Sequence, residues 1–316
     1  MSAIAALWLA LAIDRWFGEP PARAHPVVWI GRCLGWAGRR IAPPAAAPAR
    51  ALAAFAGGAL AWCAGAALVA GVAWAVAEAA SRLPAWAGLA LTGIALKPLL
   101  AWRMLRDEVL AVEAALGRSL DEGRARLARL VSRDVGSLDT LGVRESAIES
   151  LAENLNDSLV APLFWFALFG LPGAALYRFA NTADAMWGYL GEREGRQWTW
   201  AGKWAARADD LLSWLPARLT ALFLWGASAV PGAGLRALRR EAGRTPSPNS
   251  GWPMAAMALR LGIRLGKPGV YVLNAAGRGA AAADTAQAAR LAARGVALAG
   301  GCATAVIGCL ALRGVG

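Results

Sequence analysis

The feature that most constrains this chain is a set of long apolar runs with almost no charged side chains. Ala51–Ala77 and Gly295–Leu312 contain none, and Leu83–Trp102 contains only Lys97. A helix of about 20 apolar residues is long enough to span a bilayer. Of the 316 residues, 58% are hydrophobic and 17% are charged, a composition outside the usual range of soluble domains. The sequence therefore predicts an all-α, polytopic integral membrane protein.

Two further apolar runs contain residues that interrupt or destabilise a membrane helix. Leu159–Tyr177 holds two prolines and two glycines, whereas Leu211–Leu235 holds Pro216, Arg218 and Pro231. Proline removes a backbone hydrogen-bond donor, and a charge inside an apolar segment is costly. We therefore expect about five hydrophobic helices, at least one of them broken or re-entrant, together with amphipathic cytoplasmic helices.

The succession of segments indicates a single membrane-embedded domain over residues 1–316. The short run Ala3–Ile13 predicts a short or interfacial helix that continues through Phe17. After it we expect a basic loop at 14–50, a helical hairpin at 51–102, amphipathic and acidic helices at 103–158, broken apolar helices with a polar connection at 159–235, a second polar connection at 236–294 and a C-terminal span at 295–312.

Charge and rare residue types exclude several classes of protein. The formal net charge is +12, but the arginines are spread over every loop and form no basic patch interleaved with aromatic residues, which excludes nucleic-acid binding. Such loops are typical of multi-pass proteins of the cell (inner) membrane, with the active site expected on the cytoplasmic side. His25 is the sole histidine and excludes a multi-histidine metal site. The four cysteines have no C-x-x-C spacing, and we interpret them as small core residues.

The most informative polar segment is Glu145–Asp157, ESAIESLAENLND, which directly precedes an apolar run. Wound as an α-helix, it places four carboxylates on one face with Asn154 beside them. This acidic stripe consists of Glu145, Glu149, Glu153 and Asp157. Like charges four residues apart repel unless a cation lies on them. We expect the stripe to bind Mg²⁺, an ammonium group or arginines; the alternative is a helix face exposed to solvent.

Two segments beside the apolar runs add further polar groups. In NTADAMWGYLGERE, Asn181 and Asp184 can supply oxygen ligands, although a helix cap would also explain Asn181. In KWAARADDLLSWLPARLT, the carboxylates of Asp209 and Asp210 occur together with arginines. These arginines are Arg207 and Arg218. Arg218 lies in an apolar run, where a charge either has a function or extends to the membrane surface.

Two turn-like segments offer groups suited to an anion. In SRDVGSLD, Arg133 either holds a phosphate or clamps the carboxylate of Asp134 beside it, and a helix-capping pair before the acidic helix is the alternative. In SPNSGWPMAAMA, Ser247 and Asn249 belong to a turn that we expect to present free backbone N–H groups and hydroxyls.

Taken together, these segments resemble one known family. The motifs DRWFGEPPARAHPVVWIG, SRDVGSLD, AIESLAENLNDSLVAPLFW, GLPGAALYRFANTADAMWGY, AARADDLLSWLPARLT and SPNSGWPMAAMA follow one another in this order. This succession is similar to that of the CobD/CbiB family, cobalamin-biosynthesis membrane proteins described as adenosylcobinamide-phosphate synthases. The matched polar positions also include Asp14, Glu19 and His25. The chain departs from the family pattern at Thr245, at Met254 and soon after Glu194.

The resemblance implies a reaction and a set of site residues. The reaction uses ATP and Mg²⁺ to join (R)-1-amino-2-propanol phosphate to adenosylcobyric acid, which gives adenosylcobinamide phosphate. The implied catalytic residues are Glu153, Asp157, Asp209 and Asp210, one of the last two accepting the ammonium proton. The implied Mg²⁺ ligands are Glu149, Glu153, Asp157 and Asp184. The implied substrate- and phosphate-binding residues are Arg133, Asn154, Asn181, Arg207, Arg218, Ser247 and Asn249.

Other function classes stay open at this point. A family relative of similar architecture serves as a membrane sensor, and a buried carboxylate stripe would also suit a cation transporter or a non-catalytic scaffold for other corrinoid-pathway enzymes. Transport predicts flux across sealed vesicles without a corrinoid, whereas the synthase predicts turnover in detergent without a gradient. The partners expected for the synthase are adenosylcobyric acid, aminopropanol phosphate, membrane lipid and other corrinoid-pathway enzymes.

Overall fold

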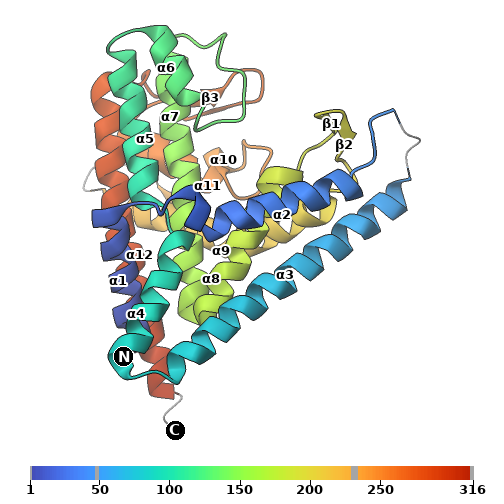
Figure 1. Cartoon of the computed structure of the whole chain (residues 1–316). Coiled ribbons are helices and arrows are strands. Elements are labelled where there is room, and N and C mark those ends of the chain that lie inside the picture. The colour runs from blue at the N-terminus through green and yellow to red at the C-terminus, as the bar shows by residue number, and fades with distance from the viewer. Residues whose placement is uncertain (1, 47–49, 229–233, 314–316) are drawn as a thin grey trace. The chain divides into compact units, whose positions relative to one another are not determined.

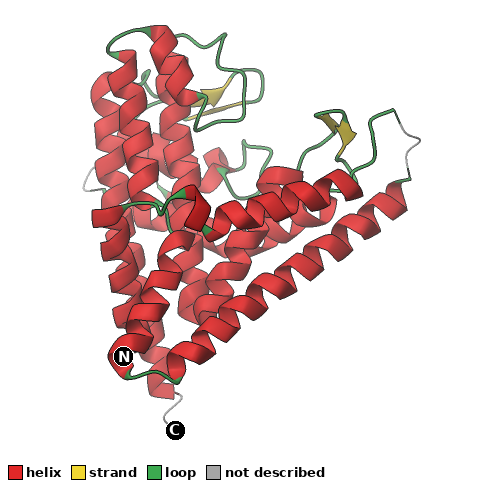
Figure 2. Cartoon of the chain, viewed as in Figure 1, coloured by secondary structure: helices red, strands yellow, loops and turns green. Residues whose placement is uncertain are grey.

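The computed structural model describes residues 2–46, 50–228 and 234–313, and this part of the chain is almost entirely helical (Figure 2). Within it, strands occur in two short antiparallel hairpins. Four of its helices are long and apolar enough to cross a membrane. They are Ala51–Ser81, Ala85–Leu116, Thr140–Trp187 and Ala282–Arg313. The prediction of an all-α polytopic membrane protein is therefore confirmed.

The number of candidate spans is lower than the sequence led us to expect. The run Leu211–Leu235 is not among the four spans found in the described ranges. Helix α9 (Lys203–Gly226) covers its first part, with Pro216 inside the helix, and residues 229–233 lie outside the described residues. The charged residues of α9, which include Asp209, Asp210 and Arg218, make it too polar for a lipid-facing span.

The broken helix predicted at 159–177 is confirmed. Helix α7 (Thr140–Leu155) passes through a π-helical turn, η3 (Asn156–Val160), into α8 (Ala161–Trp187). Inside α8, Gly170 has φ 63° and ψ −154°, a conformation that a side chain would strain. Pro172 follows two residues later and lacks a backbone N–H. The apolar run is therefore split at Gly170.

The chain folds as two compact units that are interleaved along the sequence. Unit 1 comprises residues 1–100, 161–213 and 303–316, and unit 2 comprises residues 101–160 and 214–302. Helices α9 and α12 (Ala282–Arg313) each begin in one unit and end in the other. The single membrane-embedded domain stays a prediction.

Unit 1 is built from the N-terminal helices and α8. Its other elements are α1 (Ser2–Phe17), η1 (Ala22–Ala24), α2 (Pro26–Ile41), α3 (Ala51–Ser81), α4 (Ala85–Leu96), η2 (Lys97–Leu99), and the hairpin β1 (Glu192–Arg193) and β2 (Arg196–Gln197). Helix α1 packs on α4, and both α2 and α3 pack on α8 (Figure 1). The expected N-terminal helix is confirmed as α1. The basic loop expected at 14–50 instead contains helix α2, with Pro26 at its first turn and a cap from His25.

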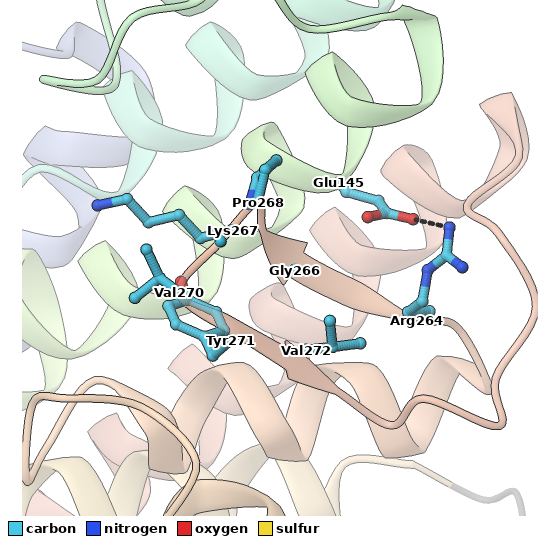
Figure 3. A pocket seen from close by; sticks show the side chains of 9 residues that line it. Glu145, Arg264, Gly266, Lys267, Pro268, Val270, Tyr271 and Val272 are labelled. Atoms are coloured by element: carbon cyan, nitrogen blue, oxygen red, sulfur yellow. Dashed lines mark ion pairs between the residues drawn. The ribbon is translucent and has the colours of Figure 1, made fainter.

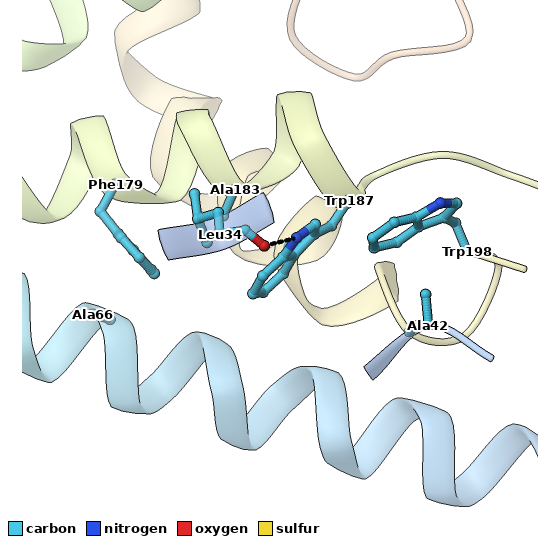
Figure 4. Packing of buried hydrophobic residues seen from close by; sticks show 9 residues of the cluster. Leu34, Ala42, Ala66, Phe179, Ala183, Trp187 and Trp198 are labelled. Atoms are coloured by element: carbon cyan, nitrogen blue, oxygen red, sulfur yellow. Dashed lines mark hydrogen bonds between the residues drawn. The ribbon is translucent and has the colours of Figure 1, made fainter. Parts of the chain in front are cut away.

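Aromatic residues form the core of unit 1. Trp187 on α8 lies beside Trp198, in one buried cluster with Leu34 and Phe179, and its indole Nε1 donates a hydrogen bond to the Leu34 carbonyl at 3.1 Å (Figure 4). Helix α3 comes so close to the segment before α9 that a Cβ on Gly58 would lie 1.9 Å from the Ala201 carbonyl oxygen. Glycine at position 58 therefore fixes how closely α3 packs.

Unit 2 surrounds the acidic helix α7. Its other elements are α5 (Trp102–Leu116), α6 (Leu120–Leu127), α10 (Leu235–Ala242), α11 (Gly251–Leu261), and the hairpin β3 (Leu265–Lys267) and β4 (Tyr271–Leu273). Helices α5, α6 and α7 confirm the amphipathic and acidic helices expected at 103–158. The segment 236–294 is more than a connection, because it contains two helices and a hairpin, and α12 begins at Ala282, ahead of the expected start at 295.

The cysteines do not lie in the core. All four are free thiols and exposed, with Cys63 on α3 and both Cys302 and Cys309 on α12. The interpretation as core residues is therefore wrong. Because α3 and α12 are candidate spans, their outer faces meet lipid, where a small apolar side chain is equally suitable.

Candidate functional site

The acidic helix α7 is started by a cap that the sequence did not single out. The carboxylate of Asp139 accepts a hydrogen bond from the Gly142 backbone N–H at 2.7 Å, which satisfies one of the free donors of the first turn. Asp134 instead accepts from the Gly136 N–H at 2.9 Å within its own loop. The capping pair of Arg133 and Asp134, weighed as an alternative, is therefore wrong, and Arg133 is available for another partner.

Two of the four residues of the acidic stripe are buried in the interior of unit 2. Helices α5, α6 and α11 and strand β3 pack around α7. Glu145 and Glu149 are only 6% and 1% exposed, whereas Glu153 near the end of the helix is exposed. The alternative of a solvated helix face is therefore wrong for Glu145 and Glu149. A buried carboxylate needs a cation or hydrogen-bond donors to offset the lost hydration.

Arg133 supplies that cation for Glu149. Its Nη2 lies 2.9 Å from Glu149 Oε2. The carboxylate that Arg133 holds is therefore one of the acidic stripe, whereas the prediction was a clamp on the neighbouring Asp134. Three buried polar atoms beside this pair have no hydrogen-bond partner among the described residues: Glu149 Oε1, Arg133 Nη1 and the hydroxyl of Ser146. Buried polar groups are nearly always satisfied, so a group of unsatisfied ones indicates a place for a ligand, ion or water.

The β3–β4 hairpin lies beside the stripe and carries further charged groups. Arg264 Nη2 is 3.7 Å from Glu145 Oε1, and this pair borders a cavity of about 400 Å³ that is otherwise lined by the hairpin (Figure 3). Lys267 points away from the Glu145–Arg264 pair in the same view. The hairpin therefore carries two separate cations beside the acidic helix, one at its start and one near its turn.

Tyr271 is the neutral polar group of this region. Burial, and after it the neighbouring carboxylates of Glu149 and Glu153, raise the pKa of the Tyr271 phenol well above its ordinary value. Its hydroxyl lies 3.8 Å from the sulfur of Met254 on α11. Tyr271 therefore stays protonated and can donate a hydrogen bond at any physiological pH.

The last two residues of the stripe region are held locally. The amide of Asn154 donates to the Ser150 carbonyl at 2.9 Å, one turn earlier. Asp157 lies in the π-turn and accepts a hydrogen bond from Asn156 at 2.8 Å. Both side chains therefore have defined positions next to the buried part of the stripe.

Arg218 contacts the SPNSG turn, although the turn does not present the free backbone N–H groups that were expected. Arg218 donates to the Asn249 side chain at 3.2 Å and lies over the Trp214 and Trp252 rings at 4.2 and 4.9 Å. The Ser247 hydroxyl accepts the backbone N–H groups of Asn249 and Ser250, each at 3.2 Å. The expectation of free N–H groups in this turn is therefore wrong for these two, which the serine satisfies.

Five of the predicted site residues belong to unit 1: Asn181, Asp184, Arg207, Asp209 and Asp210. Asn181 lies inside α8 and accepts a hydrogen bond from Arg178 at 3.4 Å, so the helix-cap alternative is wrong. On α9, Arg207 lies 3.6 Å from Asp210, one turn away. Burial raises the pKa of the Asp210 carboxyl above its ordinary value, although Arg207 opposes this shift.

Comparison with known proteins gives the decisive observation on ancestry. The model of the family described as "CobD/Cbib protein" matches residues 7–298, which is most of the chain. This chain belongs to the CobD/CbiB family. Its matched region includes α7, the β3–β4 hairpin and all the predicted site residues.

Individual relatives agree with the family match. A probable cobalamin biosynthesis protein CobD of Methanothermobacter thermautotrophicus is 39% identical over 87% of this chain and 88% of its own length. One from Pyrococcus abyssi is 40% identical over 86% of each chain. The cobalamin biosynthesis protein CobD of Rhodobacter capsulatus is 38% identical over 86% of this chain and 84% of its own. No solved structure matches the chain.

Membership in the CobD/CbiB family supports a role in cobalamin biosynthesis but leaves the metal site as a prediction. Among the described residues, no group of three or more histidine, cysteine or acidic side chains is close enough to hold a metal ion without further ligands. Mg²⁺ is commonly held by one or two carboxylates with substrate phosphates and water as its other ligands. The buried, unsatisfied oxygen of Glu149 fits that chemistry.

Sequence reasoning missed four basic or aromatic residues of this CobD/CbiB chain. Arg264, Lys267 and Tyr271 all belong to LGIRLGKPGVY, a segment shortly after SPNSGWPMAAMA in which no site residue was predicted. Lys97 appeared only as the one charge of a membrane run. It is 3% exposed in the structure. A lone charge in an apolar segment is costly unless it is paired, so the position of Lys97 in the sequence already indicated a buried partner.

Proposed function

We propose that this chain is an adenosylcobinamide-phosphate synthase. It joins (R)-1-amino-2-propanol phosphate to adenosylcobyric acid in a reaction that consumes ATP and requires Mg²⁺. The observation that carries the proposal is Glu149, a buried carboxylate with one oxygen on Arg133 and the other without a hydrogen-bond partner among the described residues. Family membership and the relatives' role in cobalamin biosynthesis support the corrinoid substrate.

Amide formation at neutral pH requires the carboxyl oxygen to become a leaving group. In the proposed reaction, a carboxylate oxygen of adenosylcobyric acid attacks the terminal phosphorus of ATP, and ADP leaves. The neutral amine of aminopropanol phosphate then attacks the acyl carbon of the resulting acyl phosphate, and inorganic phosphate leaves. One proton is lost from the amine nitrogen, which calls for a general base.

The acidic stripe is the proposed holder of the metal ion. We propose that the Mg²⁺ ligands come from among Glu149, Glu153, Asp157 and Asp184, with one or two of these carboxylates on the ion and substrate phosphates and water as its other ligands. When bound, Mg²⁺ neutralises phosphate charge and orients the transferred group. Arg133, Arg207 and Arg218 are proposed to bind phosphate oxygens, because guanidinium groups form paired hydrogen bonds with them. Asn154, Asn181, Ser247 and Asn249 are the proposed neutral contacts to the same substrates.

The general base is proposed to be Asp209 or Asp210, with Glu153 and Asp157 as further catalytic carboxylates. Burial raises the pKa of Asp210, which makes its carboxylate a better proton acceptor than an exposed aspartate. Loss of turnover in Asp210→Asn with ATP binding retained supports this role. Unchanged turnover in both Asp209→Asn and Asp210→Asn contradicts it.

The test of the proposed function is a mass-spectrometric assay of detergent-solubilised protein with adenosylcobyric acid, aminopropanol phosphate, ATP and Mg²⁺. We expect an amide product that falls by at least roughly 100-fold in Glu149→Gln, the scale expected when a group that stabilises transferred charge is removed. Glu122→Gln is the matched control, because Glu122 lies on the surface of α6 and, among the described residues, its carboxylate pairs with Arg118 alone. No amide from folded wild-type protein contradicts the proposal and favours a sensor, transporter or scaffold.

We also propose that the active site faces the cytoplasm from the inner membrane, because ATP is a cytoplasmic substrate. The basic loops favour the same orientation. In a variant whose four native cysteines are replaced by alanine, a cysteine introduced at Asp134, beside Arg133, should react with a membrane-impermeant maleimide in inside-out vesicles and not in right-side-out vesicles. The reverse pattern would contradict the proposed orientation.

A further inference from the structure

Unit 1 contains a second cavity, and no residue of the acidic helix lines it. It has a volume of about 1470 Å³ and is bounded by α2, α3, η2 and α8. Its lining includes Trp29 and Trp36 on α2, Ala64 on α3, and Glu19 and Lys97. Pockets for drug-sized ligands usually measure about 300–1,000 Å³. This cavity therefore suits a ligand larger than an ordinary metabolite.

One wall of this cavity holds a buried charged cluster, whereas the rest of the lining is mainly apolar apart from Arg32. Lys97 Nζ lies 2.8 Å from Glu19 Oε2 and 3.4 Å from Asp14 Oδ1. Lys97 and Asp14 are only 3% and 1% exposed. Charged groups are expensive to withdraw from water even when paired, so such a cluster is weak evidence for stability alone. Its place at a cavity wall indicates a role toward a ligand.

The hydrogen bonds of this cluster show what kind of group it accepts. His25 Nδ1 accepts the Val27 backbone N–H at 3.2 Å, so in the neutral ring Nε2 carries the proton and donates to Glu19 Oε2 at 3.0 Å. Glu19 Oε1 is buried and has no hydrogen-bond partner among the described residues. Lys97 has three N–H donors and two carboxylate neighbours. The cluster thus offers one acceptor and one donor side by side.

An acceptor beside a donor is the complement of a primary carboxamide. The amide NH₂ can donate to Glu19 Oε1 while the amide carbonyl accepts from Lys97. A carboxylate lacks the donor, and a phosphate adds negative charge next to two carboxylates. The geometry therefore selects a neutral carboxamide over an acid.

The apolar walls suit a flat ring system. Trp29 is held by a hydrogen bond from its Nε1 to the Arg23 carbonyl at 3.0 Å, and the Trp36 ring is covered by the Arg40 guanidinium at 3.8 Å. Both rings are about half exposed, at 50% and 55%. Fixed aromatic rings favour flat ligands because they stack with little loss of side-chain freedom.

We propose that this cavity binds the corrinoid, with the macrocycle against the α2 and α3 walls and one peripheral carboxamide between Glu19 and Lys97. A corrin ring is large, flat and rich in methyl groups, and its rim carries primary carboxamides. This inference rests on the proposed function, because it assumes that the corrinoid is a substrate of this chain. It assigns the site of that substrate to residues of unit 1.

The test measures corrinoid binding directly, without ATP or amine. Detergent-solubilised protein is dialysed to equilibrium against cobyric acid, whose visible absorbance reports the bound fraction. Ala64→Phe fills the cavity from the exposed side of α3 and should raise Kd roughly tenfold or more, in line with the cost of overpacking a fitted site. Ala67→Phe is the matched control, because Ala67 is exposed on the same helix and does not line the cavity.

A second measurement tests the carboxamide contact. On wild-type protein, a corrinoid with carboxylates in place of its carboxamides should bind roughly tenfold more weakly than cobyric acid. That difference should shrink in Glu19→Gln, whose amide oxygen and NH₂ no longer repel an anion. If the affinity ratio between the two corrinoids is the same in wild type and in Glu19→Gln, the carboxamide assignment is overturned. This holds even if Glu19→Gln binds both corrinoids more weakly than wild type does.

The outcomes separate this inference from the proposed function. If wild-type protein binds and turns over the corrinoid and Ala64→Phe has the wild-type Kd, the cavity assignment is wrong and the synthase proposal is unaffected. If Ala64→Phe loses co-purified phospholipid but keeps corrinoid affinity, the cavity is a lipid site and the inference is overturned. If folded wild-type protein neither binds nor converts the corrinoid, the proposed function fails and this inference fails with it.

Discussion

Arg133 and Glu149 form an ion pair at 2.9 Å in which the carboxylate side chain is only 1% exposed and the guanidinium side chain 18%. Sixteen residues separate them in the sequence, so the pair ties the loop before α7 to the middle of that helix. A carboxylate at this depth depends on its cation, because an unpaired buried charge loses its hydration without compensation.

Removing the Arg133 guanidinium should destabilise the protein strongly. We expect Arg133→Met to lower the free energy of unfolding by about 3–5 kcal/mol, and the double variant Arg133→Met/Glu149→Gln to recover a large part of it. Arg118→Met, which breaks an exposed pair with Glu122, should cost at most about 1 kcal/mol. Denaturant titration in detergent measures all three variants. Equal losses in the Arg133 single and double variants would contradict the dependence of Glu149 on its cation.

The phenol of Tyr271 should remain protonated well into the alkaline range. Burial and the Glu149 and Glu153 carboxylates raise its pKa in the folded state, so its contribution to stability is present below the ordinary tyrosine pKa of about 10 and is lost as pH rises through the folded value. The ultraviolet difference spectrum between wild type and Tyr271→Phe should show no phenolate at about pH 10 while the protein is folded. Half-ionisation of this tyrosine near that pH would contradict the expected shift.

The sequence predicted those parts of the fold that depend on local rules. The uncharged run Ala51–Ala77 must be a helix in lipid, and the Gly170–Pro172 segment must interrupt one, whatever packs around them. The helix α2 was missed because its apolar face is interleaved with arginines, and composition alone made it resemble a loop. The exposure of the cysteines was missed because apolar residues in a membrane protein can face lipid as readily as the core.

The site was predictable where its residues share one helix and not where contacts come from distant segments. The four-residue spacing of the acidic stripe placed Glu145 and Glu149 on one face, but no sequence rule shows that β3 and α11 cover that face. The partners Arg264 and Lys97 lie 119 and 78 residues from Glu145 and Glu19 in the printed numbering. Contacts at such separations depend on how the helices pack, which periodicity does not encode.

Acid should remove the stabilising effect of Glu19. Burial opposes ionisation of this carboxyl, but hydrogen bonds and charge from His25 and Lys97 outweigh it and hold the pKa of Glu19 below the ordinary value of 4.5. Its contribution is therefore fully present above about pH 4.5 and is lost as pH falls through the lower folded-state value. The melting temperature of wild type should exceed that of Glu19→Gln at neutral pH, and the gap should narrow below about pH 4.5. The exposed control Glu122→Gln should show no such narrowing, and a gap independent of pH would contradict the role of the charge.

Two neighbouring glycines on α3 should respond in opposite ways to alanine. A Cβ at Gly58 would lie 1.9 Å from the Ala201 carbonyl oxygen, a backbone atom that cannot move aside without displacing the segment before α9, whereas a Cβ at Gly57 meets nothing within 4 Å. We expect Gly58→Ala to lower the free energy of unfolding by about 1–3 kcal/mol, the usual cost of overpacking. Gly57→Ala should be neutral or stabilise the helix by up to about 1 kcal/mol, because alanine has the higher helix propensity. Thermal unfolding in one detergent compares the two directly, and equal melting temperatures would show that α3 does not pack on the Ala201 segment as closely as the structure has it.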